Sequence, residues 1–119
     1  MTARATVRHS GDVAIVDLAG KITLGDGSGL VRNTIKSILD GGHKNILLNL
    51  SGVTYMDSAG LGEIVGSYAT VANLGGSVKL LNPQGKVKDL LSVTKLYAVF
   101  VTFNDEEPAV RSFAASAQA

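Results

Sequence analysis

An acidic side chain and a hydroxyl stand next to each other at Asp57 and Ser58, inside the segment YMDSAGLGEIVG. Apolar residues predominate in the preceding segment, NILLNLSGVT, which predicts a buried strand. In the following segment, LGEIVGSYATVANLGG, apolar residues recur at helical spacing and predict a helix. The pair therefore lies at a strand-to-helix turn, where a serine can attack a substrate, cap the helix or receive a modification.

Nucleophilic catalysis at Ser58 would need a general base within hydrogen-bond reach. The surrounding residues, MDSAG, lack the first glycine of the Gly-x-Ser-x-Gly nucleophile elbow. The histidines are His9, near the first turn, and His43, in the loop that enters the strand before Ser58. Loops at the two ends of a strand in a parallel sheet lie at opposite edges, so His43 is expected about 15 to 20 Å from Ser58. We therefore predict that the chain is not an enzyme.

No metal or cofactor site is predicted. The chain has no cysteine, and its 2 histidines and scattered carboxylates do not supply the converging ligands that a metal site needs. The glycine-rich segment GDGSG, residues 25–29, lacks the lysine of a P-loop and the Gly-x-Gly-x-x-Gly spacing of a dinucleotide-binding turn. A loop that caps the first helix explains this segment.

Ser58 keeps two interpretations. Ser and Asp are preferred helix N-caps, because their side-chain oxygens accept hydrogen bonds from free N–H groups of the first turn. Gly60 and Gly62 fit a cap less well, since each glycine weakens a helix by roughly 1 kcal/mol relative to Ala. They would leave the backbone around the Ser58 hydroxyl uncovered for a docking protein or a kinase. On this interpretation, Gly60→Val is expected to weaken partner binding more than folding.

The elements that must position Asp57 and Ser58 alternate along the chain. Strands are predicted in ATVRHSGDVAIVDLAG, which holds a hairpin, and in KNILLNL, SVKLLN and YAVFVTF. Helical spacing of apolar residues predicts helices that begin near Val31, Leu61, Val87 and Pro108. The order β-β-α-β-α-β-α-β-α indicates an α/β sandwich, with a mostly parallel central sheet of about five strands and helices packed on it.

Length and composition restrict the remaining possibilities. With 119 residues, 45% of them hydrophobic, the chain is predicted to form a single domain, residues 1–119, whose tail frays from about residue 115. A nucleic-acid-binding protein is expected to carry a clustered basic face, and a net charge of +1 gives no electrostatic case for such a partner. No stretch reaches the roughly 18 to 20 apolar residues of a membrane span, and no signal peptide precedes the first strand. We therefore expect a cytoplasmic protein without direct membrane insertion.

The segment LNLSGVTYMDSAGLGEIVGSYATVANLGGSVKLLN resembles the STAS domains of bacterial anti-sigma-factor antagonists. That family has a strand, a short turn, the motif Asp-Ser-[Ser/Ala]-Gly-[Leu/Ile/Val]-Gly, a helix and a Gly-Gly turn. The segment KVKDLLSVTKLYAVFVTFNDEEPAV also resembles the family, so the likeness covers nearly the whole chain and implies a STAS-like fold. It also implies a partner-binding surface that includes the matching residues Asp57, Ser58, Ala59, Gly60, Leu61 and Gly62.

The resemblance further implies a partner-switching protein. In such systems the unphosphorylated antagonist binds an anti-sigma factor that is also a Ser/Thr protein kinase, and this binding frees a sigma factor for transcription. The kinase phosphorylates the serine at the position of Ser58, which releases the antagonist, and a PP2C-type phosphatase reverses the modification. STAS domains also serve as scaffolds in signalling assemblies or as accessory subunits of membrane transport systems. This alternative, without phospho-switching at Ser58, stays open.

The chain departs from the family pattern after its second predicted strand. Members often carry an Asp shortly after the glycine that ends this strand, close in space to the phosphoserine. Here Gly20 is followed by Lys21-Ile22-Thr23, and Asp26 comes three residues later. Thr23 occupies the position of the family's Asp, so Thr23 and Asp26 are both candidate partner-binding residues.

Overall fold

A computed structural model describes residues 3–23 and 29–118 of the chain. Within these residues, one sheet has the strand order β1-β2-β3-β4-β5, in which β1 is antiparallel to β2 and all other neighbours are parallel. The strands are β1 (Arg4–Ser10), β2 (Val13–Ile22), β3 (Asn45–Met56), β4 (Ser77–Leu81) and β5 (Thr102–Phe103). The helices are α1 (Leu30–Asp40), α2 (Ser58–Asn73), α3 (Gly85–Val93), the 3-10 helix η1 (Leu96–Ala98) and α4 (Glu106–Gln118). The predicted α/β order and the mostly parallel sheet are confirmed.

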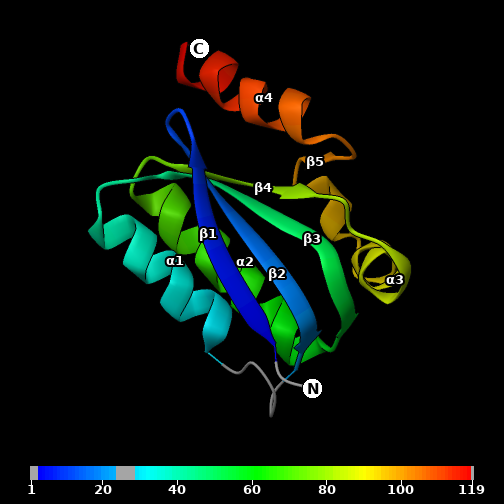
Figure 1. Cartoon of the computed structure of the whole chain (residues 1–119). Helices are drawn as coiled ribbons and strands as arrows, with labels where there is room; N and C mark the ends of the chain where they lie inside the picture. The colour runs from blue at the N-terminus through cyan, green and yellow to red at the C-terminus, as the bar shows by residue number, and fades with distance from the viewer. Residues whose placement is uncertain (1–2, 24–28, 119) are drawn as a thin grey trace.

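Helices cover both faces of the sheet (Figure 1). α1 and α2 lie side by side on one face, and α4 lies on the other. In β3, Leu48 belongs to the core beneath α1 and α2, whereas its neighbour Leu47 packs with α4. Successive side chains of a strand point to opposite faces, so β3 is buried on both. This is the physical reason for the consecutive apolar residues Ile46, Leu47 and Leu48 in KNILLNL.

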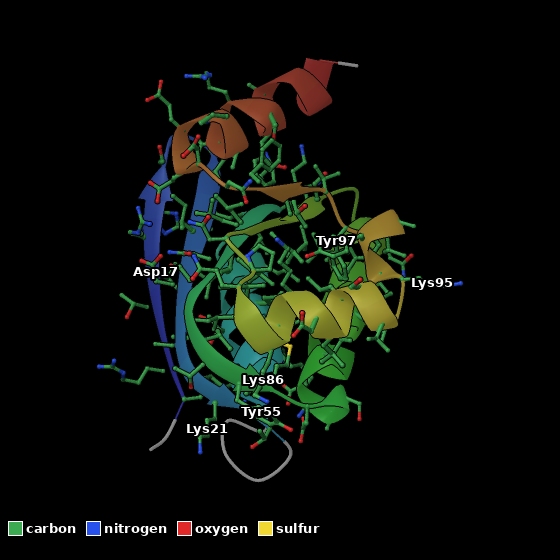
Figure 2. All side chains as sticks on the ribbon, turned by 90° about the vertical axis from the view of Figure 1, so that its right-hand side faces the viewer. Asp17, Lys21, Tyr55, Lys86, Lys95 and Tyr97 are labelled. Atoms are coloured by element: carbon green, nitrogen blue, oxygen red, sulfur yellow. The ribbon has the colours of Figure 1, made fainter. Side chains whose placement is uncertain are left out.

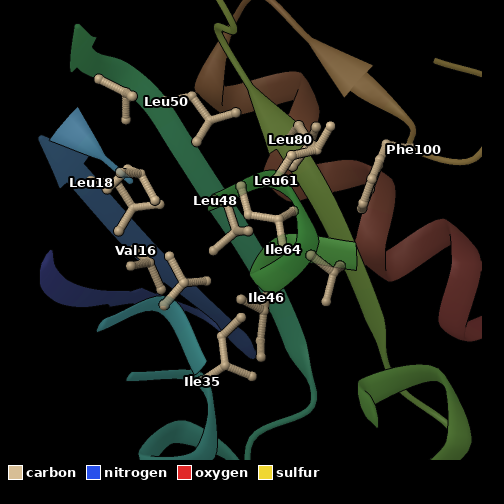
Figure 3. Close-up of a cluster of buried hydrophobic side chains, with 14 of the residues drawn as sticks. Val16, Leu18, Ile35, Ile46, Leu48, Leu50, Leu61, Ile64, Leu80 and Phe100 are labelled. Carbon is tan, nitrogen blue, oxygen red and sulfur yellow. The ribbon is translucent and has the colours of Figure 1, made fainter. Parts of the chain in front are cut away.

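The larger core fills the space between the sheet and α1, α2 and α3 (Figure 3). Leu61 and Ile64 of α2 join the cluster that contains Leu48 and Leu80 of the sheet. Leu61 is only 5% exposed, and burial of a side chain of this size contributes roughly 1.5–3 kcal/mol. This burial fixes the first turn of α2, which carries Ser58, against the sheet.

The strand predicted at residues 97–103 is wrong over most of its length. Only Thr102–Phe103 pairs with β4, and residues 96–98 form η1 instead. Phe100 turns into the larger core, where its ring centroid lies 5.1 Å from that of Tyr68. Tyr97, Val99 and Val101 are exposed, so within residues 97–101 Phe100 alone anchors this connection, and the β-branched and aromatic composition of the run did not distinguish it from a strand.

Several boundaries also differ from the prediction. β2 continues through Lys21 and Ile22, which lie beyond the predicted strand segment that ends at Gly20. α2 begins at Ser58 rather than near Leu61, and α4 begins at Glu106 and extends to Gln118. Most of the predicted GDGSG loop lies outside the described residues. The extension of β2 matters for function, because it brings the end of this strand level with the end of β3.

Candidate functional site

The predicted site lies where the parallel strands β2 and β3 end side by side. Their last paired residues are Ile22 and Met56. Thr23 and Asp57 come next in the two strands, so the structure brings these two predicted residues to the same edge of the sheet. Ligands of open α/β sheets commonly bind at this carboxyl edge. The other candidate from the first loop, Asp26, lies outside the described residues.

Asp57 is the N-cap of α2. Its backbone is extended (φ −101°, ψ −178°), and its carboxylate accepts a hydrogen bond of 2.8 Å from the N–H of Gly60. Its own N–H donates to the carbonyl oxygen of Ile22 at 3.4 Å, which joins the start of the helix to the end of β2. Ser58 is the first residue of the helix and is exposed. The capping role that the sequence left open for Ser58 therefore belongs to Asp57.

Gly60 is required by the packing of α2 on β2. A Cβ atom at Gly60 would lie 2.1 Å from the carbonyl oxygen of Ile22, a backbone atom that cannot move aside cheaply. Gly60 is buried and so is Leu61, which means that both residues position the first turn from beneath. The expectation that Gly60 lacks a side chain in order to uncover backbone for a partner is wrong, because the space is used inside the fold.

The remaining motif residues face outward. Gly62 is exposed, and a Cβ atom there would meet nothing within 4 Å. Ala59 is half-buried, as is the capping residue Asp57. The surface of the motif therefore consists of the Ser58 hydroxymethyl group, the edges of Asp57 and Ala59, and the bare backbone of Gly62.

One exposed surface near the ends of β2 and β3, which the sequence analysis did not assign to the site, carries Lys21, Tyr55 and Lys86 (Figure 2). Lys21 and Tyr55 are neighbours in the register of β2 and β3, and both are exposed. The Nζ atom of Lys86 lies 5.9 Å from the ring centroid of Tyr55. Met56 is buried, and successive residues of a strand face opposite sides, so Tyr55 faces away from the core that contains Met56.

Glu63 is a second residue that sequence reasoning missed. From α2 its carboxylate accepts hydrogen bonds from the N–H of Gly29, at 2.7 Å, and the N–H of Arg32, at 3.5 Å, at the start of α1. Gly29 is the N-cap of α1 and has no side chain with which to cap it. A carboxylate is also favourable near the positive end of the helix dipole. Glu63 therefore fixes α1 relative to the helix that carries Ser58.

Neither histidine lies near Ser58, where it could act as a general base. His9 and His43 lie together, with ring centroids 4.8 Å apart, at the end of β3 opposite Ser58. β3 has 12 residues, and a strand of that length spans up to about 36 Å. The described residues hold no cluster of His, Cys, Asp or Glu suited to a metal ion. None of the helices among them has the length and apolar character needed to cross a membrane.

The fold and the motif at the β3–α2 turn define a STAS domain. Residues 4–109 match the STAS domain family, and the chain belongs to this family. It is 30% identical over 96 residues to the anti-sigma-B factor antagonist of Bacillus subtilis, an alignment that covers 81% of this chain and 86% of the relative. A shorter alignment with the TM1081 homolog of Thermotoga neapolitana is 41% identical and covers 49% of this chain and 51% of the relative, about half of each.

The similarity extends to solved structures. The anti-sigma factor antagonist SpoIIAA in its unphosphorylated form matches with a TM-score of 0.69 and 17% identity, over 92% of this chain and 96% of that chain. Bacillus SpoIIAA in the phosphorylated form matches with a TM-score of 0.69 and 20% identity, over 92% and 99% of the two chains. At these identities the match establishes the fold, and the predicted STAS-like architecture is confirmed.

Proposed function

We propose that this chain is an anti-sigma-factor antagonist whose binding is switched by phosphorylation of Ser58. In the unphosphorylated form it binds an anti-sigma factor that is also a Ser/Thr kinase, and a sigma factor is released. The kinase then phosphorylates Ser58 and the chain dissociates, until a PP2C-type phosphatase removes the phosphate. The chain supplies the docking surface and the hydroxyl and is not itself an enzyme. These partners act in the cytoplasm.

The observation that supports this proposal is the difference between Asp57 and Ser58. Asp57 caps α2, which leaves Ser58 exposed and without a structural task at the helix start. A kinase needs access to the hydroxyl, and an exposed first helical residue provides it. The names of the relatives agree with this function, since one is an antagonist of an anti-sigma-B factor and another is known in a phosphorylated form.

The chemistry of the site explains how a phosphate would act as a switch. Phosphorylation adds about −1.5 to −2 charges and strong acceptor oxygens to Ser58. The N-terminus of α2 tolerates an anion, because its N–H groups and its dipole favour negative charge, so the fold survives. The interface does not, because the added charge lies beside Asp57 and must be desolvated against a partner surface that fits a hydroxyl. A buried unpaired charge at an interface costs roughly 2–5 kcal/mol.

A phosphorylation assay with the full chain tests the proposal. Candidate anti-sigma kinases of the host are incubated with ATP and the chain, and modified residues are mapped by mass spectrometry. We expect phosphate on Ser58, none on that position in Ser58→Ala, and normal modification of the control Ser51→Ala, which alters another exposed serine. Phosphate absent from Ser58 in the host, together with stable association with a transporter or a signalling scaffold, would instead support the alternative role of STAS domains.

A further inference from the structure

A groove with a volume of about 590 Å³ lies between α1 and α2. Ile35 and Leu39 of α1 contribute apolar side chains to it, and Ala59 contributes one from the first turn of α2. The two helices lie side by side on the face of the sheet opposite α4 (Figure 1). Because Ala59 is the neighbour of Ser58, the groove begins at the motif and extends away from it along α2.

The floor of the groove contains glycines that the fold itself does not require. Cβ atoms at Gly62 and Gly66 would meet nothing within 4 Å, in contrast to Gly60, where a Cβ would overlap backbone. A glycine in a helix interior weakens the helix relative to Ala. Since packing within the chain does not explain them, their effect is to keep the floor low enough for close approach by another molecule.

A buried hydroxyl provides a second, independent feature of the groove. Ser67 lines it and is 5% exposed, and its Oγ atom has no hydrogen-bond partner among the described residues. Buried polar groups are normally paired, because an unpaired one loses its hydrogen bonds to water without replacement. A serine hydroxyl can rotate, so a polar group on an occupant of the groove can pair with it.

The charges along the groove define the partner's chemistry. Arg32 and Lys36 lie one turn apart on α1 and line the groove, and among the described residues that line it Glu63 is the one acidic residue. The Glu63 carboxylate already accepts hydrogen bonds from the first turn of α1. The groove therefore presents an excess of positive charge along its α1 side and favours an occupant with acidic side chains at that edge.

We propose that the groove between α1 and α2 binds an amphipathic helix of the partner protein, apolar on its inner face and acidic beside Arg32 and Lys36. A helix fits better than an extended strand, because the backbone groups of α1 and α2 are paired within the helices and offer no edge for strand addition. Assignment of this helix to the anti-sigma factor rests on the proposed function. The groove then forms part of the same interface as Ser58.

This arrangement explains how a single phosphate could release the partner. Ser58, Gly62 and Gly66 recur every four residues, so they follow one side of α2. Ala59, the neighbour of Ser58, lines the groove, so a phosphate on Ser58 would add negative charge near the groove and repel an acidic helix bound in it. Arg32 and Lys36 attract the acidic side chains of the bound helix, whereas the phosphate repels them.

Titrations of the isotope-labelled full chain, followed by amide chemical shifts, test this inference. The first probe is an amphipathic peptide of about 18 residues, long enough to form a helix, with leucines at helical spacing and glutamates along one edge. The second probe is the same peptide with lysine in place of each glutamate, and the third is decanoate. We expect the acidic peptide to shift amides of both groove-lining helices and the basic peptide to bind at least about tenfold more weakly.

Two variants with matched controls locate the binding. Gly66→Leu adds a side chain to the groove at a position where a Cβ atom meets nothing within 4 Å, and it should weaken binding of the acidic peptide at least about tenfold. Ala69→Leu, on an exposed part of α2 outside the groove, should not. Lys36→Glu should weaken it as well, and Lys88→Glu on α3 should not. The same pattern is expected for the anti-sigma kinase that phosphorylates Ser58, and melting curves verify that each variant is folded.

Three results would overturn the inference: binding of decanoate without the peptides, binding of no probe, or binding that Gly66→Leu leaves unchanged. Its failure is distinct from failure of the proposed function, because phosphorylation of Ser58 is measured in a separate assay. A chain that is phosphorylated on Ser58 and binds no helix in the groove contradicts only the groove assignment. A chain that binds the acidic helix and is never phosphorylated contradicts only the switch.

Discussion

The carbonyl oxygen of Ile22 lies 2.1 Å from the position that a Cβ atom would take on Gly60. Any side chain at Gly60 must therefore push α2 away from β2. This movement would also lengthen the hydrogen bond from the N–H of Asp57 to the carbonyl oxygen of Ile22. We expect Gly60→Ala to lower the free energy of unfolding by about 2–3 kcal/mol, within the range for overpacked sites. Urea denaturation of the purified variant measures this loss.

Gly62 is the matched control for this effect. Its Cβ position is open, so Gly62→Ala should raise the stability of the chain by up to about 1 kcal/mol through helix propensity alone. Equal stability of the Gly60→Ala and Gly62→Ala variants would contradict the close approach of α2 to β2. Because Gly60 acts on folding, its variants are also unsuitable for testing partner binding.

Asp57 and Ser58 should differ in their effects on stability. Asp57→Ala removes the cap on α2 and should lower the free energy of unfolding by about 1 kcal/mol, whereas Asp57→Asn retains an acceptor oxygen and most of the stability. Ser58→Ala, on an exposed first helical residue, should change it by less than about 0.5 kcal/mol. Thermal melts of the three variants suffice, and the reverse order would mean that Ser58 is the cap.

The parts of the structure that sequence reasoning predicted best are those with strong local patterns. KNILLNL holds the apolar residues Ile46, Leu47, Leu48 and Leu50, and it forms the first half of the central strand β3, which is buried on both faces. The Asp-Ser pair was placed correctly between a strand and a helix, because a change of hydrophobic period marks such a turn. The choice between Asp57 and Ser58 as cap could not be predicted, since both residue types suit the position.

The features that were missed depend on contacts between residues far apart in the chain. Gly60 meets Ile22, and Glu63 caps α1 at Gly29, and neither contact leaves a local pattern in the sequence. Residues 97–101, predicted as part of a strand, form an irregular connection instead, in which Phe100 packs against Tyr68. Such contacts follow from the relative placement of elements, which periodicity does not provide.

The ion pairs of Arg8 should make the free energy of unfolding fall at acidic pH. Its Nε donates to Asp17 at 2.6 Å and its two terminal nitrogens donate to Glu106 at 2.9 and 2.5 Å, which joins the β1–β2 hairpin to α4. These hydrogen bonds lower the pKa of Asp17 below its usual 3.8 and that of Glu106 below its usual 4.5. Folding therefore lowers both pKa values. The Arg8 hydrogen bonds stabilise the fold fully at pH values above the ordinary pKa values of Asp17 and Glu106. This stabilisation is lost as the pH falls through the lower pKa values of the folded state.

Arg8→Met tests this contribution. The three side chains are partly exposed to solvent, so we expect a loss of about 1 kcal/mol or less at neutral pH, smaller still at high salt. The difference between the variant and the wild type should shrink as the pH falls below about 4. Arg111→Met, which removes a more exposed pair with Glu107, serves as the control and should have a weaker effect. A pH-independent difference for Arg8→Met would show that lost packing, rather than charge, is responsible.

The phospho-switch makes the sharpest prediction at Ser58 itself. Ser58→Asp places negative charge beside Asp57 at the helix start, where the dipole favours it, so its circular dichroism spectrum should match the wild type. At the interface the charge must be desolvated, and a penalty of at least about 2 kcal/mol corresponds to roughly thirtyfold weaker binding to the anti-sigma kinase. Ser58→Ala should bind about as tightly as the wild type and accept no phosphate. Titration of the three proteins against the same kinase decides the matter, because equal affinities for Ser58→Asp and the wild type would exclude a switch based on charge.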